Sequence, residues 1–215
     1  MAFVPCAPVR GARPQQAWPM LQLPAGPRDQ HPRGGARNAA EREPAADAQT
    51  KTLYPYIVAG PTAVPFDMRK PPQDYEPQGY HLHARYSALS QPTKRMRFIS
   101  PNLPWTIEIE GEWICCALIW DRIYESLQRH IRSSEWVLIA HSDVKRQEIE
   151  KARKKRLEQF PDDDPRPKRI DWLGEMTLFR GLQRDDALAR RMLLPGRDEC
   201  PNTYVIRWDS HWPRP

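Results

Sequence analysis

The sequence lacks several features that would place it in a familiar class of proteins. Four cysteines occur among its 215 residues, at Cys6, Cys115, Cys116 and Cys200. They are too few and too scattered for a disulfide framework, so we expect a reducing compartment. No apolar run approaches the roughly 18 residues that cross a bilayer, and prolines interrupt the apolar start of the chain. We therefore expect a soluble protein without a membrane partner, located inside the cell, in the cytoplasm or nucleus.

The sequence patterns of common enzyme classes are also missing. There is no glycine-rich phosphate loop, no G-x-S-x-G and no H-E-x-x-H. A thiol nucleophile needs a base within hydrogen-bond reach, and His130 and His141 are the candidate bases for Cys115, Cys116 or Cys200. The first two cysteines fall where a strand is expected to meet a buried helix. Because free cysteine is among the most buried residue types, packing is the better interpretation.

Two histidines, His81 and His83, stand two residues apart, a spacing that can place both rings on one side of an extended segment. No carboxylate or cysteine stands beside them to complete a metal site, so a polar loop is the simpler interpretation. We predict no catalytic, cofactor-binding or metal-binding residue, and no cofactor.

Positive charge is unevenly distributed. The first 100 residues carry 13 Lys and Arg against seven acids, whereas the rest of the chain carries 20 against 20. The run Lys151–Arg156 holds five basic residues, which is one pattern of a phosphate-binding patch. Glu148, Glu150 and Glu158 flank this run, so a solvated helix face with i, i+4 ion pairs is favoured. Nucleic acid is therefore an unfavoured partner for the folded domain.

Composition divides the chain into three parts. Residues 1–52 form an arm rich in Pro, Arg and Ala, with eight of the 24 prolines in the first 50 positions and no hydrophobic period, so we expect disorder. Residues 53–209 are predicted to form a single domain that contains an internal loop at 73–94. Residues 210–215 are a short tail.

Several short strands are expected in this domain. Val64–Arg69 has the pattern of an edge strand that prolines terminate. Trp105–Glu110 alternates strictly between apolar and polar residues, as a half-buried strand requires. The following Gly111-Glu112 predicts a hairpin turn that returns through Trp113-Ile114. Further strands are expected at 97–100, 170–173, 176–180 and 203–208.

The clearest predicted helix runs from Trp120 to Ile131, where large apolar residues recur at i, i+3, i+4, i+7 and i+11. The residues that precede it, 115–117, offer no side chain to cap its free amides, so another group must do so. A second helix is expected from Ser142 or Asp143 to about Gln159.

A third, short helix is expected after a cap at Asp185 or Asp186. No βαβ unit repeats along the chain. The elements together predict an α+β fold in which an antiparallel sheet of about five to seven short strands is packed by two or three helices.

Five segments in register resemble the successive blocks of an uncharacterised domain that is abundant in mushroom-forming (basidiomycete) fungi. They are Phe66-Asp67-Met68-Arg69-Lys70-Pro71-Pro72, Leu103-Pro104-Trp105-Thr106-Ile107-Glu108-Ile109, Ile119-Trp120-Asp121-Arg122-Ile123-Tyr124, Asp171-Trp172-Leu173-Gly174 and Phe179-Arg180-Gly181-Leu182. The resemblance spans about 53–208. It departs at 116–118, where members tend to place Gly-Asp before the helix. That family has no known function, so the resemblance implies no catalytic residue.

These observations favour a non-catalytic protein-interaction module whose protein partner the sequence does not identify. Two alternatives remain open: an enzyme of an unrecognised type, and a weak nucleic-acid binder that uses the basic first hundred residues. The oligomeric state is not indicated by any pattern in the sequence.

Overall fold

The computed structural model describes residues 51–211, apart from 76–79 and 194–197. Nearly all of the predicted arm at 1–52 and most of the tail at 210–215 lie outside the described residues. The described elements, in chain order, are η1 (Pro55–Ile57), β1 (Phe66–Asp67), η2 (Pro72–Asp74), α1 (Tyr80–His83), β2 (Arg95–Ile99), β3 (Ile107–Glu110), α2 (Cys116–Gln128), α3 (Ser133–Val137), α4 (Asp143–Gln159), α5 (Arg169–Trp172), β4 (Leu178–Gln183), α6 (Asp186–Met192) and β5 (Thr203–Asp209).

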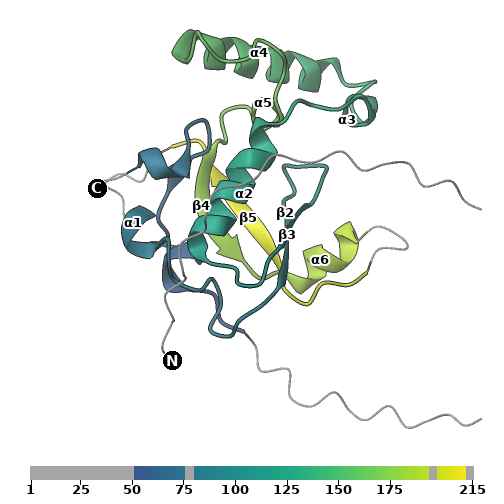
Figure 1. The fold of residues 1–215 in the computed structure, drawn as a ribbon. Coiled ribbons are helices and arrows are strands. Elements are labelled where there is room, and N and C mark those ends of the chain that lie inside the picture. The colour runs from purple at the N-terminus through teal and green to yellow at the C-terminus, as the bar shows by residue number, and fades with distance from the viewer. Residues whose placement is uncertain (1–50, 76–79, 194–197, 212–215) are drawn as a thin grey trace, which may run out of the picture. The chain divides into compact units, whose positions relative to one another are not determined.

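The five strands form one mixed sheet in the order β1-β4-β5-β2-β3 (Figure 1). Three neighbouring pairs are antiparallel, but β2 and β5 run parallel. The prediction of a purely antiparallel sheet is therefore wrong, and six α-helices are described where two or three were expected. A parallel pair needs a crossover connection, and here the crossover is the whole segment between β2 and β5, which contains five of the six described α-helices.

The hairpin predicted at Gly111-Glu112 is also wrong. β3 instead forms an antiparallel pair with the preceding strand, β2, so that Phe98 lies opposite Ile107 and Met96 lies opposite Ile109. The strict alternation of β3 is as predicted, because its two isoleucines are buried and its two glutamates are more exposed. After β3 the chain passes directly into α2, and 113–114 join no strand.

Helix α2 supplies the centre of the core, as predicted. Trp120, Ile123 and Leu127 are fully buried on its inner face. Its first amides are capped from elsewhere in the chain: Cys116 N–H donates to the carbonyl of Tyr86, and Ala117 N–H to that of Ala84, both at 3.0 Å. These carbonyls belong to the predicted 73–94 loop, which is partly ordered as η2 and α1. Backbone carbonyls thus accept the hydrogen bonds that a capping side chain accepts at the start of many helices.

The two later helices begin where their caps predict. Ser142 Oγ accepts from the amide of Lys145 at 3.3 Å at the start of α4, and Asp185 Oδ1 accepts from the amide of Leu188 at 2.9 Å at the start of α6. Residues 170–173 were predicted to be a strand, but they form helix α5 and its end. The reason is local, since Asp171 Oδ2 accepts from the amide of Lys168 at 2.8 Å and closes a helical turn.

The two faces of the sheet differ in character. Met96 and Phe98 of β2 point into the core around Trp120. Arg97 and Ile99, which alternate with them, instead line a pocket that residues of α6 help to form. None of the helices within the described ranges has the length and apolarity that a bilayer crossing requires.

Candidate functional site: a helical platform held by buried ion pairs

The cysteines and histidines considered above are not brought together into a catalytic arrangement. Cys115, Cys116 and Cys200 are buried, and burial raises the pKa of the Cys116 thiol, which disfavours the reactive thiolate. None of these thiols forms a hydrogen bond to a histidine in the described part of the chain. His130 instead bonds Asp164 through Nε2 at 2.8 Å.

Of the two neighbouring histidines, His81 and His83, the second lies among aromatic side chains. The His83 ring stacks on Tyr56 with centroids 3.7 Å apart, and burial lowers its pKa. Its Nδ1 lies 3.2 Å from the hydroxyl of Tyr54. Over residues 51–211, outside the two gaps, no group of three or more His, Cys, Asp or Glu side chains could hold a metal ion.

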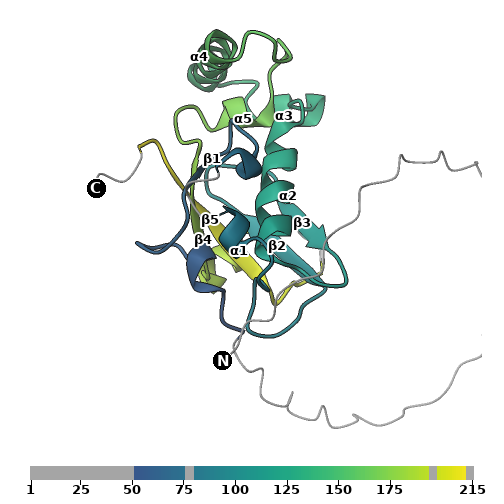
Figure 2. The same cartoon turned by 60° about the vertical axis from the view of Figure 1, so that its left-hand side comes forward.

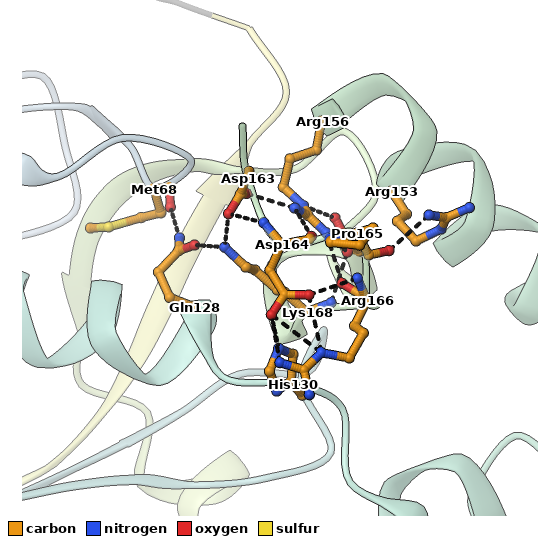
Figure 3. Close-up of polar contacts among 11 residues, drawn as sticks. Met68, Gln128, His130, Arg153, Arg156, Asp163, Asp164, Pro165, Arg166 and Lys168 are labelled. Carbon is orange, nitrogen blue, oxygen red and sulfur yellow. Dashed lines mark hydrogen bonds and ion pairs between the residues drawn. The ribbon is translucent and has the colours of Figure 1, made fainter. Parts of the chain in front are cut away.

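A buried ion-pair network lies instead where α4, α5 and the 160–168 loop meet (Figure 3). At its centre lies Arg156, which is only 3% exposed. Arg156 makes a bidentate ion pair with Asp171, in which Nε donates to Oδ1 and Nη2 donates to Oδ2, each at 2.9 Å. Its Nη1 bonds Asp163 Oδ2 at 2.6 Å and the carbonyl of Asp164 at 3.0 Å. Its Nη2 also bonds the carbonyl of Arg166 at 3.0 Å. All five guanidinium protons therefore have acceptors.

The pKa values follow from these contacts. Burial opposes the charged form of Arg156, but hydrogen bonds to Asp171 and Asp163 outweigh it and raise the pKa. Burial also works against the charged form of Asp163, yet hydrogen bonds from Lys168 and Arg156 hold its pKa below the usual range. The network is thus a set of paired charges at neutral pH.

The network extends to the core and to α3. Lys168 pairs with Asp163 and also donates to Gln128 Oε1 at 3.3 Å, while Gln128 Nε2 donates to the carbonyl of Met68 at 3.0 Å (Figure 3). A second buried pair, Arg169 with Glu135, joins α5 to α3. These contacts link the helices outside the core to α2 and to the end of β1.

Helices α3 and α4 project beyond the main core. Figures 1 and 2 both place α4 on the far side of α5 from the sheet. Only Ile149 and Arg156 of its 17 residues are buried. We call Ser133–Gln159 the α3–α4 platform. Because so little apolar surface anchors α4, the ion pairs at Arg156 are a main attachment of this helix.

The α3–α4 platform exposes large aliphatic side chains to solvent. Val137, Leu138 and Val144 are 70%, 63% and 70% exposed and lie within eight residues around the α3–α4 turn. Lys145 and Arg146 follow directly in sequence. In α4 as a whole, seven basic residues stand against four acidic ones.

A cleft of about 670 Å³ runs along the inner side of α4. One wall is the α4 face that carries Lys145, Glu148, Lys151 and Lys155. The other is formed mainly by the connection from α5 to β4, residues 172–177, and by the turn between β2 and β3. Lys145 pairs with Glu148 at 3.1 Å, and Lys155 pairs with Glu175 at 3.5 Å. Both ion pairs are solvent-exposed, so each contributes little to the stability of the fold.

Part of the chain matches a known protein family. A family of unknown function, DUF6699, matches residues 64–189, which is more than half of the 215-residue chain. The chain belongs to the DUF6699 family. The DUF6699 match includes the whole α3–α4 platform and its ion-pair network, and ends before β5. No curated protein and no solved structure matched the chain. The family assigns no function.

The sequence interpretation missed the residues of this network. The sequence pattern predicts that Arg156 belongs to a solvated basic run, but this residue lies seven positions after buried Ile149 and so shares its helix face. That spacing is the signal that identifies Arg156 as an inward-facing residue. No comparable signal marks Asp171 or Glu135, because their partners are 15 and 34 residues away in sequence.

Proposed function

We propose that this DUF6699 protein is a non-catalytic protein-interaction module that binds its partner through the α3–α4 platform. The observation that carries the proposal is the exposure of Val137, Leu138 and Val144 on a segment that buried ion pairs fix to the domain. The three residues lie within eight positions of one another, and aliphatic side chains exposed together are a common mark of protein contact surfaces.

The way in which the platform is attached supports a role in presentation. A buried ion pair is often no more stabilising than a well-packed apolar pair of the same volume, but its directional bonds define one geometry. Arg156 with Asp171, and Arg169 with Glu135, fix α4 and α3 at separate points. A fixed surface loses less conformational entropy on binding than a mobile one.

The composition of the surface favours a protein over a nucleic acid. Phosphate backbones make no use of exposed aliphatic side chains, and the acidic Glu148, Glu150 and Glu158 interrupt the basic face of α4. We infer a partner segment that carries apolar side chains flanked by acidic residues, which would complement the aliphatic turn and the adjoining Lys145 and Arg146.

Cross-linking capture of the full chain in its own cells tests this surface. The variant Val137→Ser/Leu138→Ser/Val144→Ser should lose a defined partner that the wild type captures. The matched control is Leu82→Ser, because Leu82 is 74% exposed on α1, outside the platform. Equal loss in the control, or full retention in the triple variant, would contradict the proposed surface.

A salt-dependent affinity of the purified chain for arbitrary duplex DNA, reduced by Lys51→Ala/Lys70→Ala/Lys94→Ala among the basic first hundred residues, would instead favour the nucleic-acid alternative. We also propose that residues 53–209 act as one unit apart from the arm, and that the protein works inside the cell, where Cys115, Cys116 and Cys200 remain reduced. Abundance of the family in mushroom-forming fungi is an expectation that the resemblance supports.

A further inference from the structure

The second face of the sheet carries a charge arrangement that the platform does not use. Arg97 on β2 lies between Glu108 on β3 and Thr203 on β5 in cross-strand register. Its side chain is only 5% exposed. Arginine is rarely buried to this degree unless all of its donors are paired.

The donors of Arg97 are not all paired. Nε bonds Glu108 Oε1 at 3.0 Å, and Nη1 bonds the carbonyl of Asp198 at 2.9 Å. Nη2 is buried and has no hydrogen-bond partner among the described residues. A buried donor of a charged group that lacks an acceptor is strongly unfavourable, so an acceptor supplied by a bound ligand or a water would stabilise it.

Arg97 lines a pocket of about 360 Å³ between the sheet and α6. This volume is at the lower end of the range for small-molecule sites. Apolar side chains from both sides form part of the wall: Ile99 from β2, Ala189 and Met192 from α6, and Leu193 just beyond it. The pocket therefore combines a buried cation with an apolar surface.

The charges around the pocket limit the ligand class. Its lining contains three arginines, Arg97, Arg184 and Arg190, against the two carboxylates Asp186 and Glu199. Arg184 is already paired with Asp186 at 3.0 Å, whereas Arg190 has no ionic partner among the described residues. Arg97 is likewise paired, with Glu108 at 3.0 Å. One guanidinium without an ionic partner suits a monoanion better than a dianionic phosphate, and its planar shape matches a carboxylate.

We propose that this pocket binds a small organic monocarboxylate, with its carboxylate on Arg97 and Arg190 and its aliphatic part on Ile99, Ala189 and Met192. Because Nη2 is covered, a neighbouring side chain must move aside as the ligand enters. The site is independent of the α3–α4 platform and stands or falls separately from the proposed protein partner.

An NMR titration of the full chain tests the proposal with sodium hexanoate as probe and hexanamide as its neutral match. We expect saturable amide shifts at Ile99, Ala189 and Thr203, with a Kd on the order of millimolar for so small a ligand. Arg190→Gln should weaken hexanoate binding roughly tenfold, since it removes one charged contact. The matched control is Arg191→Gln, a neighbouring exposed residue of α6 that does not line the pocket.

Arg97→Lys keeps a cation beside Glu108 but has no counterpart of Nη2, so it should also weaken binding while the amide spectrum reports whether the fold persists. Equal shifts with hexanamide, equal weakening in Arg191→Gln, or no saturation by about 50 mM hexanoate would overturn the site. Tighter binding of inorganic phosphate than of hexanoate would overturn the monocarboxylate class.

Discussion

Removal of the Arg156 charge is the sharpest test of how the α3–α4 platform is held. Arg156→Met keeps a long unbranched side chain but leaves Asp171, which is 2% exposed, without its guanidinium partner. Loss of one member of a buried ion pair costs about 3–5 kcal/mol, because the other charge stays buried and uncompensated. Set against a typical domain stability of roughly 5–15 kcal/mol, this is a large fraction.

Urea unfolding followed by tryptophan fluorescence measures the loss. With a slope of about 2 kcal/mol per M, the expected fall in midpoint is about 1.5–2.5 M. The matched control is Arg153→Met on the same helix, whose pair with Glu150 at 2.5 Å is partly exposed and should contribute less than about 1 kcal/mol. Hydrogen exchange of the α4 amides shows whether the helix detaches before the rest of the domain unfolds.

The double variant Arg156→Met/Asp171→Leu completes the test, since it removes both buried charges. It should recover part of the lost stability, because an apolar pair can replace a buried ion pair at little cost, whereas the Lys168 amide loses its side-chain acceptor. If Arg156→Met moves the midpoint no more than Arg153→Met does, and protection of the α4 amides is unchanged, the network does not hold the platform.

Two further outcomes are expected. Deletion of residues 1–50 should leave the thermal midpoint within a few degrees, and a larger fall, which about 1 kcal/mol could cause, would show that the arm packs on the domain. In acid, the folded pKa of Asp163 is depressed below its ordinary 3.8, so its contribution is fully present above that pH and is lost as the pH falls through the folded pKa. Asp163→Asn should therefore flatten the loss of stability below about pH 4 in urea melts, whereas an unchanged acid limb would contradict the role of its ion pairs.

The sequence predicts those parts of the fold that depend on neighbouring residues. The stripe on α2 and the caps at Ser142 and Asp185 are local patterns, and all three helices begin or pack as expected. Residues 170–173 were misassigned because their apolar content fits a strand, while the decisive bond is from the Lys168 amide to the Asp171 side chain. The parallel contact of β2 with β5 joins segments about a hundred residues apart, and no local pattern encodes it.

The same separation explains why the site escaped prediction. Charged residues usually remain in water, so a run such as Lys151–Arg156 favours a solvated face on average. The five acceptors around Arg156 come from Asp171 and from the 160–168 loop, and only the folded chain brings them to one point. Burial of a single member of a charged run depends on tertiary contacts of this kind.

The position of β5 bears on how the family should be studied. β5 lies between β4 and β2 in the sheet, yet it follows the residues that match DUF6699, which end at 189. Without β5, β1 with β4 and β2 with β3 would be two separate antiparallel pairs, and two-stranded pairs are marginally stable at best. β5 also supplies Thr203 to the pocket beside Arg97. A fragment that stops at 189 would therefore lose both the sheet on which α2 packs and one wall of the monocarboxylate site, so tests of either proposed site need the chain through Asp209.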